Sequence, residues 1–145
     1  MTLKQADYGS MTEEEKVLAA NQRFYTALQG LDLEAMDRVW LHEDWVKCVH
    51  PGWELLEGWD EVHQSWERIF ENTRFMRVVV SEVSVRVENR LAWVACLENL
   101  TSAFESGFEQ VTVQATNLFF LSGGEWLMVL HHSSAVPEQT PTTVH

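Results

Sequence analysis

The spacing of apolar residues changes at Thr73, and this change constrains the fold more than any other feature of the chain. Before Thr73, apolar side chains recur mostly at the spacing of amphipathic helices, and after it they alternate with polar ones as in strands. Helices followed by a run of long strands are typical of an α+β fold rather than an α/β fold. We therefore expect a cone-shaped α+β barrel, in which three N-terminal helices pack on a strongly bent antiparallel or mixed β-sheet.

Local signals mark the ends of the expected helices. Thr12 and Glu15 have the spacing of a capping box, and Gly30 can end that helix in the left-handed conformation. Asp32 can cap a short second helix that runs to Val39. The expected elements are helices at 12–30, at 32–39 and from 58 onward, short strands at 45–50 and 53–56, and long strands at 75–88, 91–105, 108–122 and 125–134.

The first long strand contains a change of phase. Its alternation runs through Val78 and Val80 and resumes at Val83 and Val85. Such a change predicts a β-bulge near Ser81, which bends the sheet. A bent sheet folded over a helical layer forms a cone with an open end, and such a concavity can hold a pocket.

Composition narrows the classes of partner. The 145 residues carry a net charge of −12 without a stripe of lysine and arginine, which argues against nucleic acid and anionic membranes as partners. No apolar stretch approaches the roughly 20 residues that cross a bilayer, and the N-terminus lacks the pattern of a signal peptide. We expect a cytoplasmic protein with reduced thiols at Cys48 and Cys96, and one domain at 12–136 between flexible tails at 1–11 and 137–145.

Several short motifs within the expected domain resemble one superfamily. The motifs are Cys48-Val49-His50-Pro51-Gly52-Trp53, Gly58, Ser65-Trp66, Cys96-Leu97-Glu98, Ala115-Thr116-Asn117 and the segment 126–134. Together with the order of elements they resemble the nuclear transport factor two-like superfamily, and within it the SnoaL-like, ketosteroid isomerase-like branch of mostly bacterial proteins. The resemblance implies the cone fold, a dimer and a pocket, and little about chemistry.

Glu98 is the candidate general base. It lies on an otherwise apolar strand face with Val94 and Cys96, where burial would raise its pKa toward neutrality. A structural hydrogen bond, or a contact with a dimer partner, would also explain Glu98. His131 and His132 are neighbours on a strand and must point to opposite faces, and the resemblance favours His132 as the second catalytic residue.

The expected pocket has apolar and aromatic walls. Asn117 offers both a donor and an acceptor, and Trp66 lies on a helix face that could form one wall. Each candidate also has a structural explanation, as core packing or as a hydrogen-bonded clip, which the sequence leaves open. The expected pocket residues are Tyr25, His50, Trp53, Trp66, Asn117 and Ser134.

No metal or other cofactor is expected. Cys48, His50, Glu98 and His132 could converge, but their spacing matches no metal-ligand motif such as His-Glu-x-x-His. The chain also lacks a glycine-rich phosphate loop between a strand and a helix, and a Gly-x-Ser-x-Gly nucleophile elbow.

Three functions remain open at this point. The first is a domain that binds a small apolar or aromatic molecule without turnover. The second is an enzyme that resembles ketosteroid isomerase or a polyketide cyclase and uses Glu98 as general base. Its oxyanion donor would be His132, Asn117 or Tyr25. The third is a domain that only dimerises or docks a partner.

The long strands also predict a homodimer. Trp93, Ala95 and Leu97 alternate with Val94 and Cys96, so both faces of the sheet carry apolar side chains. The helices can cover only one face, and the outer face therefore needs a partner sheet.

Overall fold

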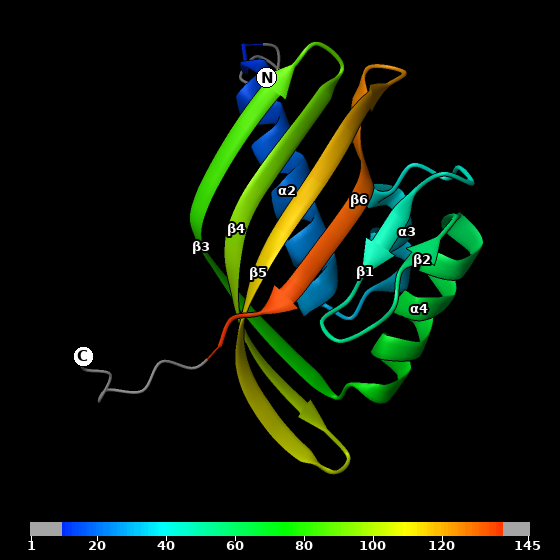
Figure 1. Cartoon of the computed structure of the whole chain (residues 1–145), viewed down its shortest axis with the longest axis vertical. Helices are drawn as coiled ribbons and strands as arrows, with labels where there is room; N and C mark the ends of the chain where they lie inside the picture. Colours follow the sequence, from blue (N-terminus) through cyan, green and yellow to red (C-terminus); the bar gives the residue numbers. More distant parts are fainter. Residues whose placement is uncertain (1–9, 138–145) are drawn as a thin grey trace, which may run out of the picture.

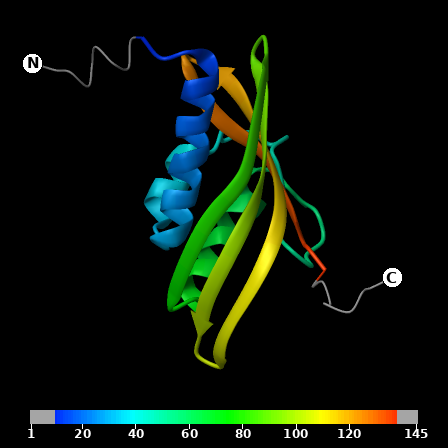
Figure 2. The same ribbon diagram turned by 90° about the vertical axis from the view of Figure 1, so that its left-hand side faces the viewer.

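Three helices pack on one side of a curved six-stranded sheet in the computed structural model, which describes residues 10–137 (Figures 1 and 2). The helices are α2 (Glu13–Gln29), α3 (Leu33–Val39) and α4 (Trp59–Asn72). The strands are β1 (Lys47–Val49), β2 (Leu56–Glu57), β3 (Phe75–Glu88), β4 (Leu91–Phe104), β5 (Gly107–Ser122) and β6 (Glu125–Ala135). This arrangement confirms the expected α+β class. The tails expected at 1–11 and 137–145 fall almost wholly outside the described residues.

The sheet is mixed, with the strand order β2-β1-β6-β5-β4-β3. Neighbouring strands are antiparallel except β1 and β6, which run parallel. In that pair Cys48 lies opposite His131. Both short strands differ from the expected 45–50 and 53–56, since β1 covers only 47–49 and β2 lies at 56–57. The expected turn at Pro51 and Gly52 is present and is closed by a hydrogen bond from Trp53 N to the carbonyl oxygen of His50. The parallel pair brings distant parts of the sequence to one place.

Both expected helix N-caps are present. Thr12 Oγ1 accepts from Glu15 N at 3.1 Å, and Glu15 Oε1 accepts from Thr12 N at 2.9 Å. Asp32 Oδ1 accepts from Ala35 N at 3.1 Å. The end of α2 differs from the expectation, because Gly30 keeps a right-handed φ of −80° and Leu31 takes the left-handed φ of 50°.

The bulge expected near Ser81 is confirmed. The register between β3 and β4 shifts between Ser81 and Ser84, and Glu82 has a positive φ of 54°. Figure 2 shows the resulting curvature of the long strands around α2. Within residues 10–137, no helix combines the length and the hydropathy that a membrane crossing requires.

Alternation along β4 sorts its side chains between two faces, as expected. Val94 and Cys96 are fully buried under the helices, whereas Trp93 is 38% exposed on the outer face. Phe75 and Val79 on the neighbouring strand β3 are also exposed. A shallow cavity of about 1020 Å³ lies on this outer face over β3, β4 and β5. The outer face therefore carries exposed apolar side chains among polar ones and is uncovered within the described chain.

Candidate functional site

A connected group of polar side chains lies buried between α2 and the inner face of β4, β5 and β6. Tyr25 Oη donates to Glu98 Oε2 at 2.5 Å, and Asn117 Nδ2 donates to Tyr25 Oη at 3.1 Å. The same Nδ2 donates to Asn21 Oδ1 at 2.8 Å. Asn117 Oδ1 and His131 Nδ1 are 2.6 Å apart. None of these five residues, here termed the polar cluster, is more than 4% exposed.

Helix spacing and strand register bring the polar cluster together. Asn21 and Tyr25 are four residues apart in α2 and therefore share its buried face. Asn117 on β5 lies opposite His131 on β6. Val94 on β4 lies opposite Asn117 and faces inward. Glu98 is four residues further along β4, and residues separated by an even number share one side of a strand, so Glu98 faces inward too. Four elements thus contribute to one hydrogen-bonded chain.

Burial sets the protonation of Glu98 and Tyr25. Removal from water raises the pKa of Glu98 to about 7, although the hydrogen bond from Tyr25 opposes this rise. Burial also raises the pKa of Tyr25, and the charge of Glu98 raises it further, so the phenol stays protonated and donates. A carboxyl with a pKa near neutrality can both accept and release a proton, as a general acid or base must.

His131 is held neutral. Burial, together with smaller contributions from the nearby His50 and His132, lowers its pKa to about 3. Asn117 donates two hydrogen bonds through Nδ2, so its Oδ1 is the acceptor that faces His131. This assignment puts the imidazole proton on Nδ1 and leaves Nε2 unprotonated.

A second group of side chains adjoins the polar cluster from the residues after β1 and from α4. His50 Nε2 lies 2.9 Å from Ser65 Oγ, which itself donates to the carbonyl oxygen of Val62 at 2.7 Å. His50 therefore donates through Nε2, and burial lowers its pKa to about 4. The Trp66 ring stands edge-on to His50 with ring centroids 4.6 Å apart, and it lies 6.0 Å from the ring of His131.

The indole nitrogen of Trp66 is unusual. Trp66 is 2% exposed. Its Nε1, like that of Trp40, is buried without a hydrogen-bond partner among residues 10–137. Buried donors in folded proteins almost always have a partner, so each exception calls for an explanation. Trp53, whose ring is 4.8 Å from that of His50, is only partly buried and joins this group to the surface.

Several of the expected site residues therefore do lie together: Tyr25, His50, Trp53, Trp66, Glu98 and Asn117. His132 and Ser134 do not, because both are exposed on the outer face while His131 and Ser133 are buried.

A bulge in β6 causes this difference. Met128 pairs with Phe119 and Leu130 pairs with Leu118, so Val129 is the extra residue. Before the bulge even-numbered residues such as Met128 face inward, and after it odd-numbered ones do. Without it, His132 would face the cluster as the resemblance suggested. The sequence gives no signal of this bulge, because Val129 is apolar and would be acceptable on either face of the strand.

Asn21 is the cluster residue that the sequence did not single out as a candidate. Its signal was an amide on the otherwise apolar face of α2, one turn before Tyr25.

The larger cavities lie away from the polar cluster. One of about 670 Å³ lies between α2, α3 and the β5–β6 turn, and the other is the outer-face cavity over β3, β4 and β5. No cluster residue lines either of them. The part of the chain that the structure describes contains no group of three or more His, Cys, Asp or Glu side chains placed to hold a metal ion.

Comparison with known sequences identifies a family. A family model for the SnoaL-like domain matches residues 17–138. F-box protein SKIP8 from Arabidopsis thaliana is 35% identical over 120 residues, which make up 83% of this chain and 49% of that protein. The chain thus spans about half the length of this curated relative.

Solved structures agree with this family. A candidate dehydratase of the NTF2-like family from Streptomyces avermitilis is 33% identical with a TM-score of 0.82, over 87% of this chain and 97% of that one. A candidate calcium/calmodulin-dependent protein kinase type II association domain from Thiobacillus denitrificans is 30% identical with a TM-score of 0.74, over 82% and 94%. A ketosteroid isomerase-like protein from Erwinia carotovora atroseptica is 22% identical with a TM-score of 0.75, over 87% and 98%.

These relatives come from a plant and from bacteria, so the expected bacterial type stays a prediction. The match over most of the chain and the shared architecture together show that the chain belongs to the SnoaL-like domain family and has an NTF2-like fold.

Proposed function

We propose that the chain binds a small, mainly apolar molecule that carries a hydrogen-bond acceptor, in the cone-shaped interior beside the polar cluster. The observation that carries this proposal is the buried, unpartnered Nε1 of Trp66. Leaving such a donor unpaired costs about 1–3 kcal/mol. A ligand oxygen that accepts a hydrogen bond from Nε1 removes this cost, so binding becomes more favourable by about the same free energy.

The surroundings of Trp66 suit a flat, uncharged ligand. The rings of Phe24, His50, Phe70 and His131 lie 4.6–6.0 Å from that of Trp66. Both histidines are neutral at physiological pH because burial lowers their pKa values to about 4 and about 3. These side chains fill the interior without a ligand, so binding requires them to move apart. The partly buried Trp53 marks the side from which a ligand enters.

A matched pair of probes tests the role of Nε1. Tetralone and tetralin have nearly the same shape, but only tetralone has a carbonyl oxygen. We expect calorimetry to show tighter binding of tetralone to the wild-type protein. Trp66→Phe should remove this preference, whereas Trp93→Phe, on the outer face, should keep it. Equal affinities for the two probes in the wild type would refute the proposal, and so would a preference that survives in Trp66→Phe.

A second function, proton transfer next to a carbonyl group, is favoured by Glu98. Its pKa of about 7 suits a base at neutral pH. In this mechanism Glu98 takes a proton from the carbon beside the carbonyl. The C–H electron pair forms the carbon–carbon double bond of the enolate, and the π electron pair of the carbonyl moves to its oxygen. Trp66 Nε1 or Tyr25 Oη donates to the resulting enolate oxygen, and Glu98 returns a proton to complete the cycle. The names of the dehydratase and ketosteroid isomerase-like relatives are consistent with such chemistry.

Deuterium exchange separates proton transfer from binding alone. Tetralone in D₂O exchanges the hydrogens beside its carbonyl when a base removes them. We expect the wild-type protein to accelerate this exchange and Glu98→Gln to abolish the acceleration while tetralone still binds. An equal exchange rate in the variant would exclude Glu98 as the base. Binding without acceleration in the wild type would leave the chain a binding domain.

Self-association through the outer sheet face is a third part of the proposal. Phe75, Val79 and Trp93 are 52%, 48% and 38% exposed there, and large exposed apolar side chains are common at interaction sites. The association-domain relative, by its name, belongs to an assembling protein. A homodimer would cover this face.

A further inference from the structure

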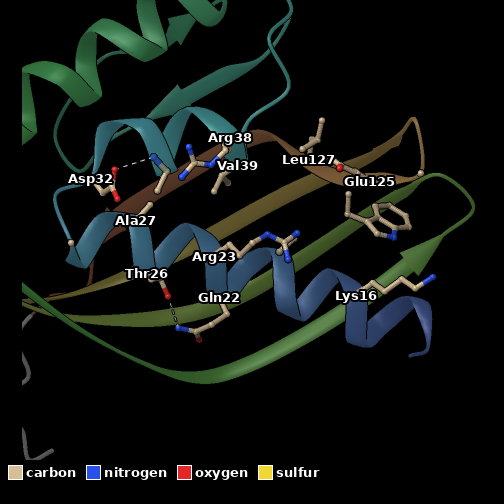
Figure 3. A pocket seen from close by; sticks show the side chains of 15 residues that line it. Lys16, Gln22, Arg23, Thr26, Ala27, Asp32, Arg38, Val39, Glu125 and Leu127 are labelled. Carbon is tan, nitrogen blue, oxygen red and sulfur yellow. Dashed lines mark hydrogen bonds between the residues drawn. The ribbon is translucent and has the colours of Figure 1, made fainter. Parts of the chain in front are cut away.

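The cavity of about 670 Å³ lies outside the polar cluster, between α2, α3 and the turn that joins β5 to β6 (Figure 3). Its volume falls within the roughly 300–1,000 Å³ of small-molecule sites. Three of the ten lysine and arginine side chains in the chain line it: Lys16, Arg23 and Arg38. We infer that this cavity, here termed the α2–α3 groove, binds a small organic anion that carries a phosphate or carboxylate group.

Two of the three cations lack a protein partner. Lys16 Nζ forms an ion pair with Glu13 at 3.0 Å. Arg23 and Arg38, in contrast, form no ion pair and no side-chain hydrogen bond with any residue in the range 10–137. Figure 3 shows that they come from different helices, Arg23 from α2 and Arg38 from α3. The planar fork of a guanidinium matches phosphate and carboxylate oxygens in pairs.

The positive charge of the groove stands out against the acidic character of the rest of the chain. The net charge of −12 repels anions over most of the surface. Two acidic residues, Asp32 and Glu125, also line the groove. Asp32 is engaged in capping α3, through its bond from Ala35 N at 3.1 Å. The groove is thus a local concentration of available positive charge on an acidic protein.

The floor of the groove defines the body of the ligand. Lys16, Ala20, Arg23 and Ala27 follow one another at intervals of four, three and four residues, so they share one face of α2. Ala20 and Ala27 line the groove with short apolar side chains that are almost fully buried. Val39 adds apolar surface from α3. An anionic head on the arginines, with an apolar body on this floor, fits the groove.

Phenyl phosphate and benzoate are suitable probes, with neutral benzyl alcohol as the matched compound without charge. We expect both anions to bind and the alcohol not to bind. Amide shifts in NMR spectra should cluster in 16–39 and 124–127, the segments that line the groove. Arg23→Gln and Arg38→Gln should each weaken binding about tenfold, the loss expected for one charge-assisted hydrogen bond. Arg68→Gln should leave the affinity unchanged, because Arg68 is exposed on α4 outside the groove.

Three results would overturn the inference. The first is no binding of either anion at millimolar concentration. The second is equal affinity for benzyl alcohol and phenyl phosphate. The third is an equal effect of Arg68→Gln and the two groove variants. All three arginines are exposed, so unchanged unfolding curves will verify that the variants fold.

Discussion

Replacing Glu98 with glutamine should change how the stability of the fold depends on pH. Burial raises the pKa of Glu98 from an ordinary value of 4.5 to about 7 in the folded state. Between these values the folded protein holds a proton that the unfolded chain has released, so its stability falls as the pH rises. The difference between the two pKa values, at about 1.4 kcal/mol per unit, corresponds to about 3 kcal/mol lost once the pH exceeds 7.

Urea unfolding at pH 5 and pH 8, followed by tryptophan fluorescence, measures this loss. In Glu98→Gln the new amide side chain stays uncharged and can still accept the hydrogen bond of Tyr25 through its carbonyl oxygen. The wild type should therefore lose about 2.5 kcal/mol more than Glu98→Gln between the two pH values, because at pH 5 the unfolded carboxyl has already released most of its proton. The titrations of His50 and His131 occur in both proteins and cancel in the comparison. Glu109→Gln, on the exposed part of β5, should follow the wild-type profile. Parallel profiles for the wild type and Glu98→Gln would refute the buried, proton-holding state of Glu98.

Three further predictions concern other side chains. Cys48 and Cys96 are free, buried and raised in pKa by burial, so a thiol reagent should label them only after denaturation, and rapid native labelling would contradict this. The pKa of His131 is lowered to about 3, so below pH 6.5 its neutral state costs up to about 1.4 kcal/mol per pH unit, and His131→Gln should lose less stability than the wild type between pH 6.5 and pH 4; an equal loss would show that His131 titrates normally. Trp93→Lys should weaken self-association at least about tenfold, as measured by sedimentation, whereas a wild-type monomer at micromolar concentration would rule out the dimer.

Most of the fold follows from signals that are local in the sequence. The change of period at Thr73, the caps at Thr12 and Asp32, and the change of phase near Ser81 each act within a few residues, and all of them hold in the structure. The parallel pairing of β1 with β6 could not be predicted in this way, because it depends on which distant segments meet.

The contacts of the polar cluster, too, could be predicted from the sequence only in part. Glu98, Tyr25 and Asn117 stood out because polar groups on apolar faces must find partners, and the structure joins them. The choice between His131 and His132 depended on a bulge at Val129, and an apolar residue there carries no phase signal. A pattern fixes the face of a strand only until the next bulge.

The parallel pairing of β1 with β6 also determines when the fold can be completed during synthesis. Cys48 is made long before His131, its partner across the strand pair. The residues at the end of α3 also depend on β6, because Trp40 forms a β-bridge with Met128 and Leu41 N donates to the Met128 carbonyl oxygen. Contacts between residues this far apart in sequence form slowly, and apolar surface stays exposed to solvent until they form. β1 and the end of α3 are therefore fixed in place only after β6 has been made, whereas α2 can pack on β3 earlier.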